Sequence, residues 1–422
     1  LAKTVKNGTA FHHAGLDQRC RTIIENAFKN RHIKLLTATP TLAAGVNLPA
    51  RRVVIPSVMR YTNNGLEKIS ILEYKQMCGR AGRPQYDDMG ESIIIAKGYP
   101  DEILEHYVDG EPEPLESKTL DEDSSLRINL LGFIYTASKF NPTSYEKIIK
   151  FFSQTFAAYQ LSDDSVLEKK VTKQLEKLKE YGMITDENGF EPTKFGIRIF
   201  YLRIDPETAF DMTGYIEDYL RGTKHTFGIL YMITNLHEFY SQYSIPDKYQ
   251  GDMDDLIDPN EKLYRNQEFL REYCFKSLLI LYKWIDAMTY QDMSDHFDAE
   301  PGDIFYIKEN AKNLVYIFTE IIKFWRDYAK ENKQKKIVSE YQSLIDESDL
   351  LKLQIQHGVP EKYLELVKIK QIGRVRAQIL YKNGFKNRLD LEKAKIEKLA
   401  KIDKIGLTIA NNIKAELTKI RY

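Results

Sequence analysis

The spacing of apolar residues divides the chain into a first part that contains strands and a longer part that is mainly helical. Before about residue 98, short apolar runs such as 33–38 alternate with polar stretches, and a helix is expected over about 17–30. Beyond residue 124 apolar residues recur every third or fourth position, as in 166–181, which places them on one helix face. The pattern predicts a partial α/β domain followed by mainly α domains.

A β-hairpin is expected within the first part. The β-prone runs 53–61 and 66–70 flank Asn63-Asn64-Gly65. Asn-Gly between two such runs is a strong hairpin signal, because both residue types tolerate a positive φ. A further strand over 92–96 is expected to close this domain.

Residues 124–202 predict three helices and a wing. The helices are expected over 125–138, 143–158 and 166–181. Gly182, Asn188 and Gly189 then frame two short strands. This order is typical of a winged helix, which can read DNA or pack on neighbouring domains; we favour packing.

Residues 203–355 predict a helical domain rich in tyrosine. An apolar helix is expected over 269–288, after an acidic stretch. Proline suits the first turn of a helix, where its missing N–H would have no partner, so a long helix is expected from Pro301 to about Lys330. The acidic run 346–349 imitates a metal-binding motif, and we interpret it as solvated surface.

The tail, 356–422, contains an internal repeat. Residues 366–380 and 399–413 share one spacing of apolar residues around an Ile-Gly pair, with an offset of 33 residues. Each repeat is expected to form two helices joined by a tight turn at Gly373 or Gly406.

The exposed N–H groups of such turns suit a phosphate. Arg374 and Arg376 follow the first turn and would add charge-assisted contacts. The tail resembles a tandem helix-hairpin-helix module, which holds the DNA backbone irrespective of sequence. A helical bundle that docks on protein is the alternative.

Charge separates the tail from the rest of the chain. Basic and acidic residues balance at 61 each overall, but residues 352–422 hold 17 Lys and Arg against 7 Asp and Glu. Residues 101–123 hold ten acidic residues. We expect the basic tail to meet phosphates and the acidic stretch to be a connector.

Composition excludes some classes. No apolar run reaches about 18 residues and no signal-like segment opens the chain, so no membrane span is expected. Cys20, Cys78 and Cys274 are scattered. They predict free thiols in a reducing compartment and no zinc site.

The strongest candidate for chemistry is Gln76-Met77-Cys78-Gly79-Arg80-Ala81-Gly82-Arg83-Pro84. Ser70 and Glu73 have capping-box spacing, so a helix should start at Ser70. If that helix continues to Pro84, Gln76, Arg80 and Arg83 share one face. Two guanidiniums and a carboxamide beside small residues suit a polyphosphate; a solvated surface helix is the alternative.

Two further motifs lie upstream of the arginine motif. The stretches 11–16 (Phe-His-His-Ala-Gly-Leu) and 38–50 (from Ala-Thr-Pro-Thr to Asn-Leu-Pro-Ala) precede the arginine motif. In order and spacing the three resemble motifs IVa, V and VI of superfamily 2 helicases of the Ski-like branch. The later chain narrows the resemblance to the archaeal Hjm-type (Holliday junction migration) DNA helicases, over essentially the whole chain.

This resemblance implies an ATP-dependent helicase that translocates 3′→5′ on single-stranded DNA and opens forks and Holliday-like branches in repair and recombination. Arg80, Arg83 and Gln76 would be catalytic, with Arg80 as an arginine finger on the γ-phosphate. ATP would also lie against Gly45 and Asn47.

The resemblance also implies DNA contacts in four regions. The hairpin would wedge the duplex apart, and the long helix would hold the emerging strand. The family expects a basic and an aromatic residue two turns apart on that helix, where this chain has Tyr306 and Asn313. The residues implied are His13, Thr39, Thr41, Met59, Tyr61, Tyr306, Lys308, Lys312, Gly373, Arg374, Arg376 and Gly406.

The expected domains follow. They are an incomplete second RecA-like motor domain (1–98), an acidic linker (99–123), a winged helix (124–202), a helical ratchet domain (203–355) and the helix-hairpin-helix domain (356–422).

No Gly-x-x-x-x-Gly-Lys-Ser/Thr motif occurs. The Walker lysine and the Mg²⁺ ligands are therefore expected on a first motor domain outside this chain, which alone should bind DNA without hydrolysing ATP. The expected partners are branched and single-stranded DNA, that motor domain, and replication or recombination proteins. A cytoplasmic, nucleoid-associated monomer is expected. An RNA helicase of the same branch and a non-catalytic DNA-binding module are the alternatives.

Overall fold

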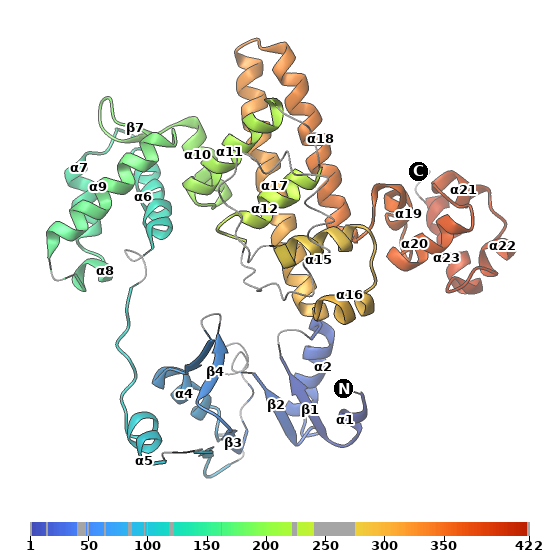
Figure 1. Cartoon of the computed structure of the whole chain (residues 1–422), viewed down its shortest axis with the longest axis horizontal. Helices are drawn as coiled ribbons and strands as arrows, with labels where there is room; N and C mark the ends of the chain where they lie inside the picture. The colour runs from blue at the N-terminus through green and yellow to red at the C-terminus, as the bar shows by residue number, and fades with distance from the viewer. Residues whose placement is uncertain are drawn as a thin grey trace. The chain divides into compact units, whose positions relative to one another are not determined.

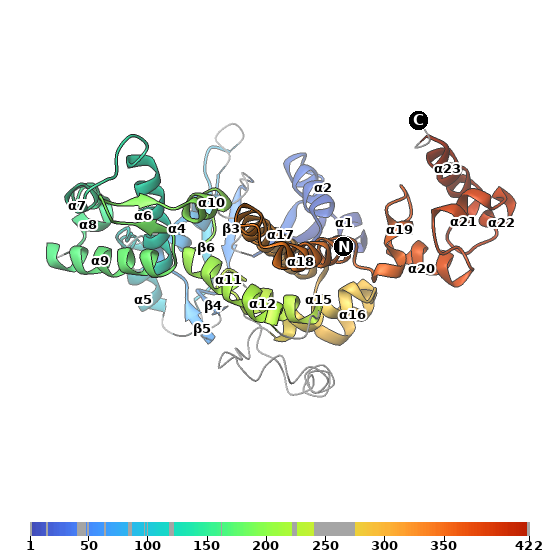
Figure 2. The same cartoon turned by 90° about the horizontal axis from the view of Figure 1, so that it is seen from above.

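A computed structural model describes most of the chain (Figures 1 and 2). The described residues are 2–13, 16–39, 48, 50–62, 65–82, 87–96, 98, 100–117, 122–161, 163–221, 226–239 and 275–419. They fall into two compact units, Leu1–Leu115 with Ala299–Asp303, and Glu116–Asp298 with Ile304–Tyr422. The finer division into five domains stays a prediction. Among the described helices, none combines the length and the apolar character that a membrane span requires.

The first unit is built on two pairs of parallel strands. Its elements before the hairpin are α1 (Ala2–Lys6), β1 (Thr9–His12), α2 (Gln18–Lys29), β2 (Leu35–Ala38) and β3 (Arg52–Ile55). β1 pairs with β2, and β3 pairs with β6 (Glu91–Ile94). The Asp17 side chain caps α2 by accepting from the N–H groups of Arg19 and Cys20, and Ile24 of α2 is buried in a small core beside β1. The predicted helix and strands are confirmed.

The predicted hairpin is also confirmed. β4 (Met59–Thr62) and β5 (Gly65–Lys68) are antiparallel, with Thr62 opposite Gly65. The turn residues 63 and 64 lie outside the described residues.

The acidic stretch after residue 99 is not the plain linker that we expected. It forms α5 (Pro100–Ile103) and a π-helix, η1 (Leu104–Val108). Tyr107 is only 1% exposed, and its hydroxyl donates to the Ile69 carbonyl at 2.8 Å. Burial of this one aromatic ring ties the first part of the stretch to the first unit, because a buried tyrosine contributes both apolar area and a paired hydroxyl.

The second unit begins with a winged helix. Its elements are α6 (Asp123–Ala137), α7 (Tyr145–Phe152), α8 (Phe156–Tyr159), α9 (Asp164–Glu180), β7 (Ile184–Thr185), β8 (Glu191–Pro192) and α10 (Lys194–Leu202). The three helices and the wing are confirmed, except that the helix expected over 143–158 is two helices. The break occurs because the Thr155 side chain accepts from the Ala158 N–H and starts a new helix.

A helical domain follows in the described residues. Its helices are α11 (Pro206–Arg221), α12 (Thr226–Asn235), α15 (Phe275–Ile285), α16 (Tyr290–Phe297), α17 (Pro301–Glu331) and α18 (Lys335–His357). α17 begins at Pro301 and ends one residue beyond Lys330, as predicted. The acidic run 346–349 lies within α18 and is not simply solvated, because Ser348 is fully buried and Glu347 accepts from the Tyr219 hydroxyl.

The tail forms a small helical module. Its elements are η5 (Glu361–Tyr363), α19 (Leu364–Val367), α20 (Arg374–Lys382), α21 (Arg388–Lys393), α22 (Ile396–Ala400) and α23 (Gly406–Lys419). The repeated apolar positions are its core. Leu366, Ile372, Ala377 and Leu380 are buried, and so are Leu399, Ile405, Ala410 and Ile413 in the second repeat.

Candidate nucleotide and nucleic-acid sites

The arginine motif begins on a short helix, α4 (Ile71–Cys78), as the sequence predicts. The Ser70 side chain accepts from the Glu73 N–H and caps the helix. The helix nevertheless ends at Cys78. The N–H groups of Arg80 and Ala81 donate to the carbonyls only three residues back, those of Met77 and Cys78, so the chain tightens into a turn.

The expectation of one helical face shared by Gln76, Arg80 and Arg83 is therefore wrong. Gln76 is exposed on α4, whereas Arg80 is half-buried in the turn that follows. Pro84 does not end the helix, which stops six residues earlier at Cys78. Arg83 and Pro84 lie outside the described residues.

The turn is instead held against the end of motif V. The Ala50 N–H donates to the Arg80 carbonyl at 2.9 Å, and the Gly82 N–H donates to the Ala50 carbonyl at 2.7 Å. Ala50 and Ala81 thus form a parallel bridge. Backbone hydrogen bonds thus join two motifs whose bonded residues, Ala50 and Arg80, are 30 residues apart in the chain. These bonds fix the position of the Arg80 backbone, from which its side chain extends. Thr41, Gly45 and Asn47 of motif V lie outside the described residues.

A close approach of two glycines shapes this turn. Gly82 has φ +94°, a value that side chains rarely adopt. A Cβ added at Gly90 would lie 2.4 Å from the Gly82 nitrogen. Gly90 is a site residue that the motif alone did not reveal, since its need for glycine arises from the tertiary contact.

Two distant residues, Glu113 and Arg60, fix α4. The Glu113 carboxylate accepts from the N–H groups of Ile71 (2.6 Å) and Leu72 (3.0 Å). Arg60 of β4 donates to both carboxylate oxygens of Glu73 at 2.8 Å. The helix that leads to Arg80 is therefore tied to the hairpin.

The buried side of α4 is apolar. Burial, together with a hydrogen bond to Cys78, raises the pKa of Tyr74 to about 12. Tyr74 is thus a neutral core residue of this helix at physiological pH.

His13 and Thr39 lie at the carboxyl edge of the β1–β2 pair. His12 stands opposite Ala38, and the Thr39 N–H donates to the His12 carbonyl at 3.2 Å. Thr39 is exposed. Ligands of parallel α/β sheets bind outside this edge, so the placement suits the expected phosphate contact. His12 itself is buried, with Nε2 3.1 Å from Glu25 Oε1.

The hairpin places Met59 at the start of β4, where it is half-buried opposite Lys68. Tyr61 lies on the same strand, and its side chain is outside the described residues. The wedge role of both stays a prediction.

The residues of α17 that are expected to contact DNA differ in whether their side chains are free to do so. Tyr306 is 56% exposed. Lys308 and Lys312 both pair with Glu309, and burial lowers the pKa of Lys308. Their charge is partly neutralised within the helix, which weakens the expectation that they supply a free cation.

The sequence interpretation missed exposed aromatic rings on α17, among them Phe305 and Tyr316. Phe305 is 57% exposed and Tyr316 is 46% exposed. Their spacing of eleven residues, three helical turns, puts both on one face, adjacent to that of Tyr306 and Asn313. The same spacing could have identified them as stacking candidates.

The turns of the tail use glycine differently from what we expected. Gly373 has φ −81°, so its freedom is not required for the turn. The left-handed residues are Gln371 (φ 71°) in the first repeat and Lys404 (φ 59°) in the second, with Gly406 at 52°. A Cβ at Gly373 or Gly406 would meet nothing within 4 Å. Both turns are open to a close backbone contact from outside.

The two arginines beside the first turn both contact other parts of the protein, and their role at phosphates stays a prediction. Arg376 donates to the carbonyls of Gln371 (2.6 Å) and Lys404 (2.9 Å) and so joins the two turns. The Arg374 guanidinium lies 4.1 Å from the centre of the Trp284 ring. Side-chain contacts from other helices decide both orientations, which the repeat could not reveal.

Comparison with known proteins agrees with this arrangement. Residues 2–85 match the family described as helicase conserved C-terminal domain, residues 227–342 match archaeal helicase, domain 4, and residues 363–419 match SAM-like helix-hairpin-helix tandem. The chain is 35% identical over 424 residues to the ATP-dependent DNA helicase Hel308 of Pyrococcus abyssi, covering 98% of this chain and 56% of that protein.

The chain belongs to the Hel308-type helicases and corresponds to their C-terminal part. It is 35% identical over 427 residues to the protein of the same name from Pyrococcus horikoshii and 31% over 422 residues to that from Thermoplasma volcanium. Each comparison covers 98% of this chain and 56% or 57% of the relative. The chain thus spans about half the length of the curated Hel308 relatives that it matches.

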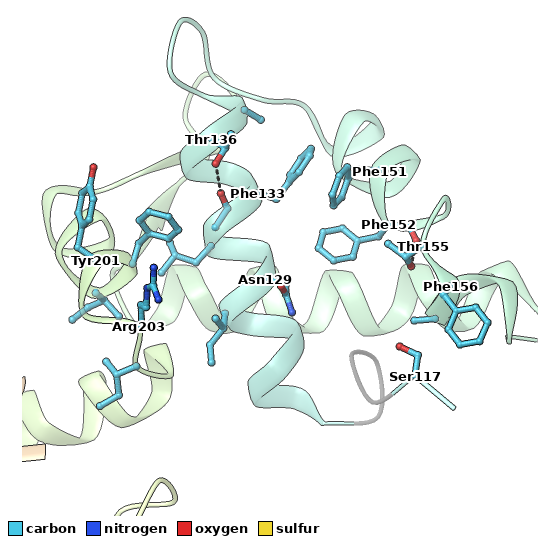
Figure 3. A pocket seen from close by; sticks show the side chains of 18 residues that line it. Ser117, Asn129, Phe133, Thr136, Phe151, Phe152, Thr155, Phe156, Tyr201 and Arg203 are labelled. Atoms are coloured by element: carbon cyan, nitrogen blue, oxygen red, sulfur yellow. Dashed lines mark hydrogen bonds between the residues drawn. The ribbon is translucent and has the colours of Figure 1, made fainter. Parts of the chain in front are cut away.

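The winged helix of this Hel308-type chain carries a large apolar cavity (Figure 3). Its volume is about 1080 Å³, and Phe133, Phe151 and Phe152 line it together with Phe156 and Phe200. Phe151 and Phe156 are about half exposed at its rim. An exposed aromatic cavity suits a protein surface better than a phosphate backbone, which favours the packing role for this domain.

Proposed function

We propose that the chain is the part of an ATP-dependent DNA helicase that carries the arginine half of the nucleotide site and the path of the translocated strand. The backbone bridge between Ala50 and Ala81 carries this proposal. It joins the arginine motif, which would sense the nucleotide, to the end of motif V, which would hold the strand, and a motor that converts hydrolysis into movement needs such a connection.

At the nucleotide, this chain would contribute positive charge and would orient the phosphate groups. Arg80 would stabilise the charge that develops on the γ-phosphoryl group, an effect worth about 10³–10⁵ in rate for an arginine finger. Gln76 and Arg83 would complete the phosphate cluster, with Gly45 and Asn47 of motif V nearby. Mg²⁺ would neutralise the phosphates from ligands outside this chain. Among the described residues, no group of three or more His, Cys, Asp or Glu could hold a metal ion.

At the nucleic acid, four regions would act in sequence. His13, Thr39 and Thr41 would grip the backbone, and the hairpin with Met59 and Tyr61 would separate the duplex. Exposed rings on α17, beginning with Tyr306, would stack on the emerging bases, each worth about 1–3 kcal/mol. The turns at Gly373 and Gly406 would hold phosphates through backbone N–H groups.

We infer 3′→5′ movement on single-stranded and branched DNA, in fork repair and recombination. DNA is favoured over RNA because the relatives are named DNA helicases and the tail matches a helix-hairpin-helix tandem. A non-catalytic binding module is disfavoured, since Gln76 lies on the capped helix α4 and Arg80 lies in the hydrogen-bonded turn that follows it.

The decisive measurement is the ATPase rate with and without single-stranded DNA, for this chain alone and joined to the N-terminal region of a Hel308 relative. We expect DNA-stimulated turnover only in the joined protein and DNA binding in both. DNA binding without turnover in either form would support the binding-module alternative. Tighter binding to a matched RNA strand would support the RNA helicase.

A further inference from the structure

The first turn of the tail module is fastened to the helical domain through Trp284 of α15. Trp284 is 3% exposed, and its indole N–H donates to the Ile355 carbonyl of α18 at 2.7 Å. A Cβ added at Gly358, which ends α18 with φ +63°, would lie 2.4 Å from Cε2 of this indole. The contacts with α18 and with the glycine that ends it therefore hold the indole ring in place, without any contribution from the helices that follow.

Arg374, the first residue of α20, covers this ring. Its guanidinium carbon lies 4.1 Å from the Trp284 centroid and 5.1 Å from that of Tyr290 in α16. Nη1 and Nη2 are buried and have no hydrogen-bond partner among the described residues. A planar cation between two aromatic rings is a stabilising arrangement that only arginine provides.

A second contact lies one turn further along α20. Gln378 Nε2 donates to the Ala287 carbonyl at 2.8 Å, and Ala287 packs in the same apolar core as the tail residues. Arg374 and Gln378 are four residues apart and so share one face of α20, which is the face turned to α15 and α16. The neighbouring ends of α16 and α20 can be followed in Figure 2.

The repeat offers an internal comparison. The position that corresponds to Arg374 in the second repeat is Leu407, which is 62% exposed. The fold of the repeat thus does not require a buried side chain there. The demand for arginine at 374 comes from the helical domain and not from the module itself.

We propose that Arg374 is a positioning residue that holds the first turn of the tail at a fixed orientation to the helical domain, and not a phosphate ligand. The fixed turn keeps the open backbone at Gly373 in one place relative to α17. This inference goes beyond the proposed function and does not depend on which nucleic acid the module binds.

The chain supplies its own reporter, because Trp284 and Trp325 are its two tryptophans. In a Trp325→Phe background, acrylamide quenching of fluorescence reports the accessibility of Trp284. We expect Arg374→Ala to expose the ring, because removing a desolvated cation–π interaction shifts the docking equilibrium by about 3- to 30-fold. Arg374→Lys should restore docking only in part, since it keeps the charge and loses the plane.

Leu407→Ala is the matched control and should leave quenching unchanged. Arg374→Met, which keeps the length and apolar stem, should also expose Trp284 and serves if the alanine variant unfolds. Circular dichroism of each variant checks that the helices are retained.

DNA binding separates the two roles. A positioning residue changes affinity while the slope of log affinity against log salt stays constant. Removing a phosphate ligand lowers that slope by about 0.7 for a single strand. Unchanged Trp284 quenching in both Arg374→Ala and Arg374→Met, with a reduced salt slope, would overturn the proposal.

Discussion

At the scale of single residues, Arg80 illustrates how backbone contacts prepare a side chain for chemistry. Its carbonyl is bonded to Ala50 and its N–H to Met77, so the origin of the side chain is fixed on both sides. A positioned charge is more useful to a transition state than a mobile one, because it needs no reorganisation when the reaction occurs.

Replacing Arg80 by alanine should therefore remove turnover and leave binding. In the chain joined to a phosphate-loop domain, we expect Arg80→Ala to lower the ATPase rate by about 10³-fold or more, with single-stranded DNA affinity nearly unchanged. Arg19→Ala, on exposed α2, is the control. An equal loss of rate and affinity would refute the assigned role.

A group of charged side chains beside the winged helix makes the stability of the folded state depend on pH. Arg127 of α6 is buried and bonded to Asp205 and Gln174. Asp211 lies near this group, and partial burial with repulsion from Glu207 and Glu238 raises its pKa to about 6. The folded state thus favours the neutral carboxyl, and stability is lost as the pH rises from about 4 through 6.

The Asp211→Asn variant should lack this dependence of stability on pH. We expect the variant to be more stable than the parent at pH 7, by up to about 1 kcal/mol because solvent screens part of the effect, and equal to it near pH 4. Urea unfolding at both pH values measures this difference. Asp218→Asn on the same helix is the control, and a gap of the same size there would exclude Asp211 as the cause.

At the scale of elements, the contact between β4 and α4 joins the hairpin to the arginine motif. The Glu73 side chain is 18% exposed and that of Arg60 48%, so the bidentate pair is partly shielded from water. Both hydrogen bonds leave one nitrogen, Nη1, and reach the two carboxylate oxygens, so the pair fixes the distance between the two side chains.

Breaking this pair should loosen the hairpin without unfolding the unit. We expect Arg60→Glu to lower the amide-exchange protection of 59–68 by about 2- to 5-fold, the range for a partly exposed ion pair. Adding Glu73→Arg should restore part of the protection by reversing the pair. If the double variant exchanges as fast as the single one, the pair does not connect these elements.

At the scale of the whole molecule, basic charge and apolar surface are separated. The excess of Lys and Arg lies in residues 352–422, whereas an open aromatic cavity of about 1080 Å³ lies in the winged helix. We therefore expect phosphate binding at the tail and protein packing at the winged helix.

Salt dependence tests this division. Lys370→Gln with Lys404→Gln removes charge beside the two open turns, and we expect the salt slope to fall by about 0.7 for each phosphate that is no longer neutralised. The same change at the exposed residues Lys150 and Lys169 of the winged helix should leave the slope unchanged. The reverse result would make the winged helix the DNA-binding domain.

Prediction from sequence succeeded where local spacing was sufficient. The 33-residue repeat, the hairpin around Asn64-Gly65 and the start of α17 at Pro301 were all visible, because periodicity and capping depend on neighbours in the chain. The arginine motif was found in the same way, as residue types at a fixed spacing. Its resemblance, with the two motifs upstream, to helicase motifs indicated the family before any distance was known.

Only the tertiary structure decided where charged side chains point and where α4 ends. Sequence placed Arg374 beside a phosphate-binding turn, and only the structure showed its guanidinium 4.1 Å from the centre of the Trp284 ring of another helix. The acidic stretch looked like a linker until Tyr107 proved to be buried. A long flexible side chain has many rotamers, and packing with distant residues selects among them. Sequence thus determined the elements and their chemistry, while contacts between distant segments determined which groups remain free to act.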